Sequence, residues 1–186
     1  SNNEINKQID TLDWNLLAKQ RKFSNKLVKI ASTCKFIEIP YLLQHQKLNL
    51  KMIEYLYDNN EITNENWVQL VESQHLSDKF LKKVISRSKI IIDWEYLIQK
   101  QKLSLEFIQK YHLNMNPMLI AYYQDLSGNE YAPIVKQLIN ENNQQRTMII
   151  KKQKLNSSNI RYIIDKYGDE SNNLFNIAIH QKLSTD

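Results

Sequence analysis

The sequence predicts an all-α protein, an α-solenoid of about seven two-helix repeats of roughly 27 residues each. Three observations lead to this prediction. The 186 residues include only 2 Gly and 3 Pro, so the tight turns that join β-hairpins have few residues to form them. Apolar residues recur at helical spacing along the chain. A short motif also returns every 23 to 29 residues, an interval typical of a supersecondary unit repeated in series.

The motif is clearest between Asp93 and Ile108, where it reads D-W-x-x-L-x-x-x-Q-x-L-S-x-x-F-I. We number the other copies from the small polar residue after the leucine, here called the anchor. The anchors are Ser24, Asn49, Ser77, Ser104, Ser127, Asn156 and Ser184. Each copy has leucine or isoleucine seven residues before its anchor and phenylalanine or leucine immediately before it. Agreement at these columns in every copy indicates a true internal repeat.

Each copy predicts two short helices. Helix A covers about ten residues before the anchor. In three copies it begins after an N-cap residue that is followed by Trp or Pro, and these N-cap residues are Asp13, Asp93 and Asn116. Helix B follows the anchor, because a Ser or Asn side chain can accept hydrogen bonds from the free amides of a first helical turn. In the fifth and sixth copies we expect helix B to start one residue later, with Tyr131 and Ile160 in the apolar slot. Helices this short are marginal alone, so neighbouring repeats must supply the core.

The predicted repeats occupy one domain, residues 1–186. Their approximate ranges are 11–36, 37–61, 62–89, 90–115, 116–142, 143–170 and an incomplete 171–186. Ile5 and Ile9 predict a short capping helix before the first repeat. The seventh repeat stops before its helix B, which suggests that the chain is a fragment of a longer protein.

Composition narrows the setting. The net charge of +5 favours an anionic partner, but the basic residues are spread along the chain rather than gathered in a tail. The single cysteine, Cys34, excludes an internal disulfide, favours a reducing compartment and is interpreted as a small core residue. No apolar run approaches the length that spans a bilayer, and no signal peptide opens the chain. We therefore expect a cytoplasmic protein without a membrane partner.

The motif resembles the short degenerate repeats of proteins from large DNA viruses and some phages. It is best kept between Asp93 and Ile108, and it is recognisable in residues 67–81 and 14–28. The richness in Lys, Asn and Ile is also similar to that of AT-rich genomes of this kind. The later copies depart from the pattern, because the Trp is replaced by Pro117, Arg146 and Leu174. The resemblance implies an interaction scaffold without shared enzymatic activity, in the cytoplasm of a host cell if the protein is viral.

Nothing in the sequence indicates catalysis. The four histidines fall in different repeats, and none has a second ligand at the helical spacing that a metal site needs. Two glycines far apart cannot build a phosphate loop. We therefore expect no enzyme activity, no cofactor, no metal and no small-molecule substrate.

Two repeated columns have a structural interpretation. Glutamine stands three residues before the anchor in six of seven copies, where its amide could hydrogen-bond turn backbone in its own or the neighbouring repeat. A position that reads a partner should vary between repeats, so we interpret this column as stabilising the fold. The tryptophans share one slot at the start of helix A and are interpreted as packing residues. The predicted structural residues are Gln46, Gln74, Gln101, Gln124, Gln153 and Gln181, with Trp14, Trp67 and Trp94.

The leading functional prediction is protein binding through variable exposed positions of helix B. The candidate contact residues are Lys79, Lys82, Lys83, Gln109 and Lys110. The alternative is RNA or DNA binding by lysines that recur two residues before the anchor. This column contains Lys22, Lys47, Lys102, Lys154 and Lys182, and it has His75 and Asp125 in the third and fifth copies. The competing interpretation of this column is solvated lysine near helix C-termini.

Overall fold

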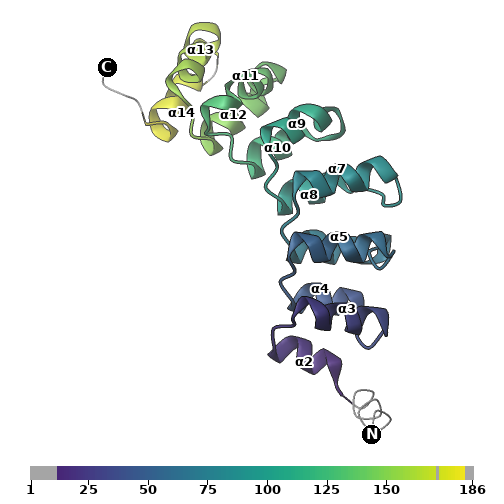
Figure 1. The fold of residues 1–186 in the computed structure, drawn as a ribbon. Coiled ribbons are helices and arrows are strands. Elements are labelled where there is room, and N and C mark those ends of the chain that lie inside the picture. The colour runs from purple at the N-terminus through teal and green to yellow at the C-terminus, as the bar shows by residue number, and fades with distance from the viewer. Residues whose placement is uncertain (1–11, 171, 183–186) are drawn as a thin grey trace, which may run out of the picture. The chain divides into compact units, whose positions relative to one another are not determined.

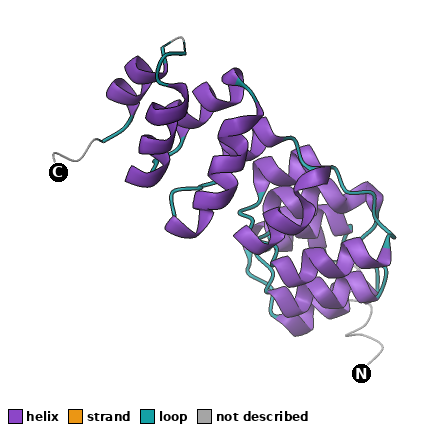
Figure 2. Cartoon of the chain, turned by 90° about the horizontal axis from the view of Figure 1, so that it is seen from above, coloured by secondary structure: helices purple, strands orange, loops and turns teal. Residues whose placement is uncertain are grey.

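The structure, a computed structural model, describes residues 12–170 and 172–182. These residues form thirteen α-helices and two short 3-10 turns, and no strand occurs among them (Figures 1 and 2). The predicted all-α helical repeat is confirmed, since two kinds of helix alternate along the chain and several helices pack on the helix two places further along within each unit described below.

Two kinds of helix alternate along the chain, as the motif predicts. Helix A of successive repeats is α2 (Trp14–Gln20), α4 (Ile39–His45), α6 (Asn64–Ser73), α8 (Trp94–Lys100), α10 (Pro117–Tyr123), α12 (Asn143–Lys152) and α14 (Asn173–His180). Helix B is α3 (Asn25–Thr33), α5 (Leu50–Asp58), α7 (Asp78–Arg87), α9 (Leu105–Tyr111), α11 (Ala132–Glu141) and α13 (Ser157–Tyr167). The 3-10 turns are η1 (His112–Asn114) and η2 (Asn129–Tyr131).

The chain divides into two compact units, Ser1–Ile92 and Asp93–Asp186, here called unit 1 and unit 2. In unit 1, α2 packs on α4 and α4 packs on α6. In unit 2, α8, α10, α12 and α14 pack in that order, and α11 packs on α13. Figure 1 shows α10, α12 and α14 of unit 2 in one layer and α9, α11 and α13 in the other. Each unit is therefore a stack of repeats in which like helices are neighbours.

The core of each unit comes from the repeated apolar columns. In the second to sixth copies the two residues seven and six before the anchor are buried, and in the second copy these residues, Leu42 and Leu43, are fully buried. Helix B contributes its third and fourth residues, such as Phe107 and Ile108 in α9, which are also fully buried. Burial of these side chains provides the hydrophobic stabilisation that a single short helix lacks.

The predicted helix caps are largely confirmed. Five anchors accept a hydrogen bond from a backbone amide in the first turn of helix B, and these are Ser24, Asn49, Ser77, Ser104 and Asn156. Asp13 and Asp93 cap helix A in the same way, and Asn116 caps α10, whose first turn contains Pro117. The anchor therefore marks the start of helix B in most repeats.

The fifth repeat corrects the prediction. Ser127 does not cap a helix, because η2 intervenes and α11 starts only at Ala132, with Pro133 in its first turn. Proline lacks an amide hydrogen and has a fixed φ, so it is favoured at a helix start and places this start later than expected. The backbone amide of Ser127 donates instead to the carboxylate of Asp125, 3.0 Å away.

In the sixth repeat, helix B starts earlier than predicted. Helix α13 starts directly after Asn156, as in the earlier copies, and not one residue later. The third position of the helix, which is Phe107 in α9, is therefore Asn159 rather than Ile160, and Asn159 is buried. The expected shift was thus a change of residue type within an unchanged register.

Three further expectations have different outcomes. Cys34 is exposed and follows the end of α3 as its C-cap, so its interpretation as a core residue is wrong. Ile5, Ile9 and Ser184 lie outside the described residues. No helix in the described part of the chain is long and apolar enough to cross a lipid bilayer.

Candidate functional site

A buried glutamine bonds the backbone of the preceding repeat in the same way in several repeats. Gln153 ends α12, and its side-chain amide donates to the carbonyl oxygens of Ala121 and Gln124, at 2.7 Å each, in the preceding repeat. Its side-chain oxygen accepts from the backbone amide of Leu126 at 2.9 Å. The same three bonds to equivalent atoms are made by Gln46, Gln74, Gln124 and Gln181. We call this set the glutamine ladder.

The ladder satisfies backbone groups that a short helix leaves without partners. The last four carbonyls of a helix have no amide within the helix to bond. Ala121 and Gln124 carry two such carbonyls at the end of α10, and Leu126 lies in the turn that follows. The side-chain amide of Gln153, which follows α12 as its C-cap, therefore bonds the free carbonyls at the end of α10, the helix A of the preceding repeat. Gln101 is also buried and ends α8.

Trp14 and Trp94, in the tryptophan slot, contact aromatic side chains of their own repeats. Trp14 stacks on Phe36 with ring centroids 5.1 Å apart, and its edge contact with Phe23 is at 6.2 Å. Trp94 contacts Phe107 of its own helix B at 6.5 Å. Trp67 is 3 % exposed. Trp94 therefore joins helix A to helix B within its repeat, whereas Trp14 packs on residues that precede and follow α3.

In the sixth repeat an arginine fills the tryptophan slot. The guanidinium of Arg146 lies 3.5 Å from the ring centre of Tyr167 and donates to the Glu170 carboxylate at 2.7 Å. Its side chain is almost fully buried. A planar guanidinium can stack on a ring as an indole does, so the slot keeps its shape with a different residue.

The predicted protein-binding residues on helix B have unequal surroundings. Lys79 on α7 and Gln109 and Lys110 on α9 are exposed, whereas Lys82 and Lys83 are half-buried. The ammonium of Lys83 lies 2.7 Å from the carboxylate of Asp58 on α5, so it holds two neighbouring repeats together. Helix α7 belongs to unit 1 and α9 to unit 2. A role for any of these residues in partner binding stays a prediction.

The lysine column is exposed but not continuous. Lys22 and Lys47 in unit 1 and Lys102, Lys154 and Lys182 in unit 2 all face solvent. In unit 2 the column is interrupted by Asp125. The pKa of Asp125 is lowered, mainly by the hydrogen bond from the Ser127 side chain and in smaller part by the charge of Lys102. A carboxylate within the column weakens its attraction for a polyanion, so nucleic-acid binding is the less favoured alternative.

A further exposed surface, which the sequence-based predictions did not include, lies on the helix-A layer of unit 2. Tyr122 and Tyr123 on α10 are 45 % and 46 % exposed, and their rings are in contact at 4.7 Å. Phe175 and Ile179 on α14 are 64 % and 57 % exposed, and they lie four residues apart on one helix face. Between these helices, α12 packs on both α10 and α14.

Lysines accompany these apolar side chains. Lys151 and Lys152 on α12 are exposed, and the ammonium of Lys152 lies 4.6 Å from the ring centre of Tyr122. This contact shows that side chains of α10 and α12 meet on the same face. We call the set Tyr122, Tyr123, Lys151, Lys152, Phe175 and Ile179 the unit-2 helix-A surface.

A signal for this surface is present in the sequence. Five residues before the anchor, the first four repeats carry the polar side chains Lys19, Gln44, Glu72 and Gln99. Tyr122 and Ile179 occupy that position in the fifth and seventh repeats. Large apolar residues at an exposed column indicate a use other than core packing.

Comparison with known proteins gives no relative. No protein-family model, no curated protein and no solved structure matches the chain. Among the described residues, no three His, Cys, Asp or Glu side chains gather where they could hold a metal ion.

Proposed function

We propose that this chain is a non-enzymatic helical-repeat scaffold that binds another protein, and that the unit-2 helix-A surface is the principal contact. The observation that carries the proposal is the exposure of Tyr122, Tyr123, Phe175 and Ile179 on neighbouring helices of one layer. Exposed aromatic residues are typical of protein interfaces, where they bury large areas at low entropic cost. The repeated columns are occupied by the fold, which leaves the variable exposed positions for recognition.

The charge of the surface indicates the kind of partner. Lys151 and Lys152 lie beside the tyrosines, so a segment that combines apolar and acidic residues would complement the surface. The lysines would raise the association rate, and the aromatic side chains would supply most of the binding free energy.

The proposed setting is the cytoplasm of a host cell, with a host or viral protein as the partner. This part of the proposal is supported by the resemblance of the motif to repeats of large DNA viruses and phages, and by the use of a single cysteine.

Affinity capture with a matched pair of variants tests the proposal. The chain, expressed with a tag in cells, should capture a defined protein, and the double variant Tyr122→Ser with Phe175→Ser should lose it. Leu113→Ser is the control, because Leu113 is 89 % exposed on η1 and is not part of the surface. Equal capture by all three proteins, or loss in the control as well, would count against the proposed contact.

A further inference from the structure

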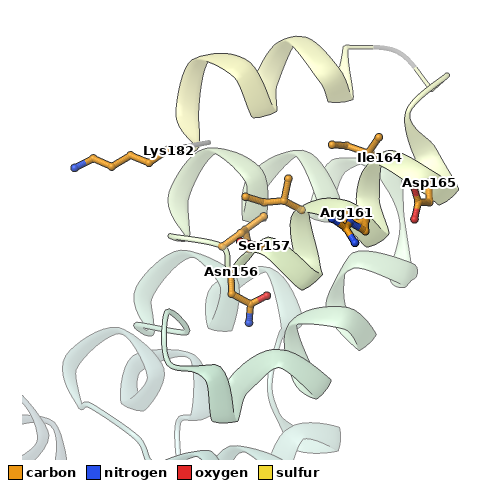
Figure 3. A pocket seen from close by; sticks show the side chains of 8 residues that line it. Asn156, Ser157, Arg161, Ile164, Asp165 and Lys182 are labelled. Carbon is orange, nitrogen blue, oxygen red and sulfur yellow. The ribbon is translucent and has the colours of Figure 1, made fainter. Parts of the chain in front are cut away.

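Unit 2 contains a small apolar pocket that is lined by residues of η1, α10 and α11. It has a volume of about 280 Å³ and lies within the stack, because α10 packs on both α8 and α12 and α11 packs on both α12 and α13. The larger pocket beside α13 (Figure 3) differs in this respect, since it borders Lys182, the last residue that the structure describes. The shape of the smaller pocket is therefore set by described helices on both sides.

This pocket lies at the tryptophan slot of the fifth repeat. Pro117 is the first residue of α10, as Trp94 is the first residue of α8, and both stand ten residues before their anchors. In the fourth repeat, the Trp94 ring contacts Phe107 and Tyr111, the third and seventh residues of α9, with ring centroids 6.5 and 5.6 Å apart. The fourth repeat therefore shows which helix-B side chains an indole in this slot contacts.

The equivalent residues of the fifth repeat line the pocket together. Ile134 and Leu138 are the third and seventh residues of α11, and both border the pocket with Pro117. A proline ring fills much less space than an indole, and Ile and Leu are smaller than Phe and Tyr. The slot is filled in the repeats on either side, by Trp94 and by Arg146. The pocket therefore corresponds to the space that an indole side chain occupies in the fourth repeat.

The deep part of the pocket is apolar. Met115, Ile120, Ile134 and Leu138 line it and are themselves buried, so they form a fixed wall. An apolar cavity of about 150 Å³ stays dry and binds benzene, because water gains no hydrogen bonds there. The sulfur of a methionine also makes favourable contacts with aromatic rings. The larger apolar space here therefore suits a ring system of two fused cycles.

The rim of the pocket is mainly polar. Its exposed residues are Leu113 on η1 with Gln137 and Glu141 on α11. A carboxylate is an acceptor for a ring N–H group, so Glu141 can orient a ligand of the indole type. Apolar walls with a few polar groups at the edge are typical of small-molecule sites. A side-chain anchor of a protein interface is instead surrounded by further contacts that exclude water.

We propose that this pocket binds a small aromatic compound with a ring system the size of indole. The assignment goes beyond the proposed function, because it adds a small-molecule site whose lining residues are not part of the unit-2 helix-A surface. The ligand class follows from the repeat itself, since the fourth repeat fills the same slot with the indole of Trp94 and the sixth fills it with the planar guanidinium of Arg146.

Titration of the full chain with indole tests the pocket directly. Nuclear magnetic resonance of isotope-labelled Ile and Leu methyl groups should show saturable shifts at Ile134 and Leu138. The dissociation constant should be on the order of 0.1 to 1 mM, as expected for a ligand of this size. The methyl signals of Ile53 and Leu56, which are fully buried in unit 1, should stay unchanged.

Three substitutions at Pro117 separate filling of the pocket from loss of the proline. Pro117→Trp restores the side chain of the fourth repeat and should abolish the shifts, while circular dichroism shows an unchanged helix content. Pro117→Ala is the matched control, because it removes the proline and leaves the pocket open, and it should bind indole as the unchanged chain does. Pro117→Phe brings a smaller ring and should weaken binding, which keeps the test decisive if the Trp variant does not fold.

The outcomes distinguish this site from the proposed protein contact. Absence of shifts in the unchanged chain, or equal binding of indole by Pro117→Ala and the variants with a larger ring, would overturn the assignment. A short peptide with one tryptophan that binds as tightly as free indole would assign the pocket to a partner's side chain and contradict the small-molecule site. Tyr122→Ser with Phe175→Ser should bind indole as the unchanged chain does, so the failure of either proposal leaves the other testable.

Discussion

In five repeats, one glutamine side chain bonds backbone groups that would otherwise need several capping residues. The amide of Gln153 bonds two carbonyls and one amide that belong to the preceding repeat. A buried polar group that loses its partner costs free energy because water cannot replace the bond. The identity of this residue is therefore set by backbone chemistry rather than by a ligand, which explains why it recurs where other polar positions vary.

Gln153→Ala should lower the free energy of unfolding by about 2 to 4 kcal/mol, since three buried backbone groups lose their partners. Urea denaturation followed by circular dichroism measures the difference. Gln99→Ala is the matched control, because Gln99 is exposed on α8, and it should change the free energy of unfolding by less than about 0.5 kcal/mol. Equal destabilisation by the two variants would show that the ladder contributes nothing beyond an ordinary surface glutamine.

The ion pair of Asp58 makes part of the stability depend on pH. The hydrogen bond from Lys83 is the largest cause that lowers the pKa of Asp58, and Arg87 adds to it. A carboxyl group with a lowered pKa stabilises the folded state above its ordinary pKa of about 4, and this contribution is lost as the pH falls through the lowered value.

Asp58→Asn should therefore cost about 0.5 to 1 kcal/mol at neutral pH, a figure kept small because the pair is partly exposed. The cost should vanish in strong acid, where the aspartate of the unchanged chain is also neutral. Urea denaturation of both proteins across the acid range measures this. A difference that is constant with pH would mean that the charge of Asp58 is not what joins α5 to α7.

The start of helix B differs between repeats that share the same motif. Ser104 accepts a hydrogen bond from the amide of Phe107 at 3.2 Å, whereas Ser127 precedes η2 and does not cap α11. Sequence reasoning could assign the caps because the side-chain types that accept from free amides are few. It could not place α11, since Gly128 and Pro133 change the backbone locally while the anchor residue stays the same.

Ser104→Ala should destabilise the protein by about 1 kcal/mol, the usual cost of losing an N-cap. Ser127→Ala should cost less than half as much, because it removes only an exposed hydrogen bond to Asp125. Thermal unfolding of the two variants side by side measures the contrast. If Ser127→Ala were the more damaging change, the description of the fifth repeat would be wrong.

Across the whole chain, the sequence was sufficient for the fold class and for the order of the helices. The regular columns carry this information, because every copy supports the same alignment of the repeats. Leu42, Leu97 and Ile149, for example, all stand seven residues before their anchors. The division into two units was not predicted, since it depends on how many contacts join successive repeats rather than on the motif.

The candidate binding surfaces were harder to predict for a related reason. The helix-B residues chosen from the sequence include Lys83, which the fold already uses on Asp58. The unit-2 helix-A surface joins side chains from α10, α12 and α14 that are far apart in sequence, and only the packing of these helices places them on one face.

Each glutamine of the ladder holds the turn of the repeat before it. Amide hydrogen exchange under native conditions tests this most directly, because the amide of Leu126 lies in a turn and bonds the side-chain oxygen of Gln153. This amide should exchange as slowly as the helical amides of α10, and Gln153→Ala should accelerate its exchange while the amide of Leu155, which bonds Gln181, stays protected. Rapid exchange at Leu126 in the unchanged chain, or the same slow exchange with and without Gln153, would contradict it.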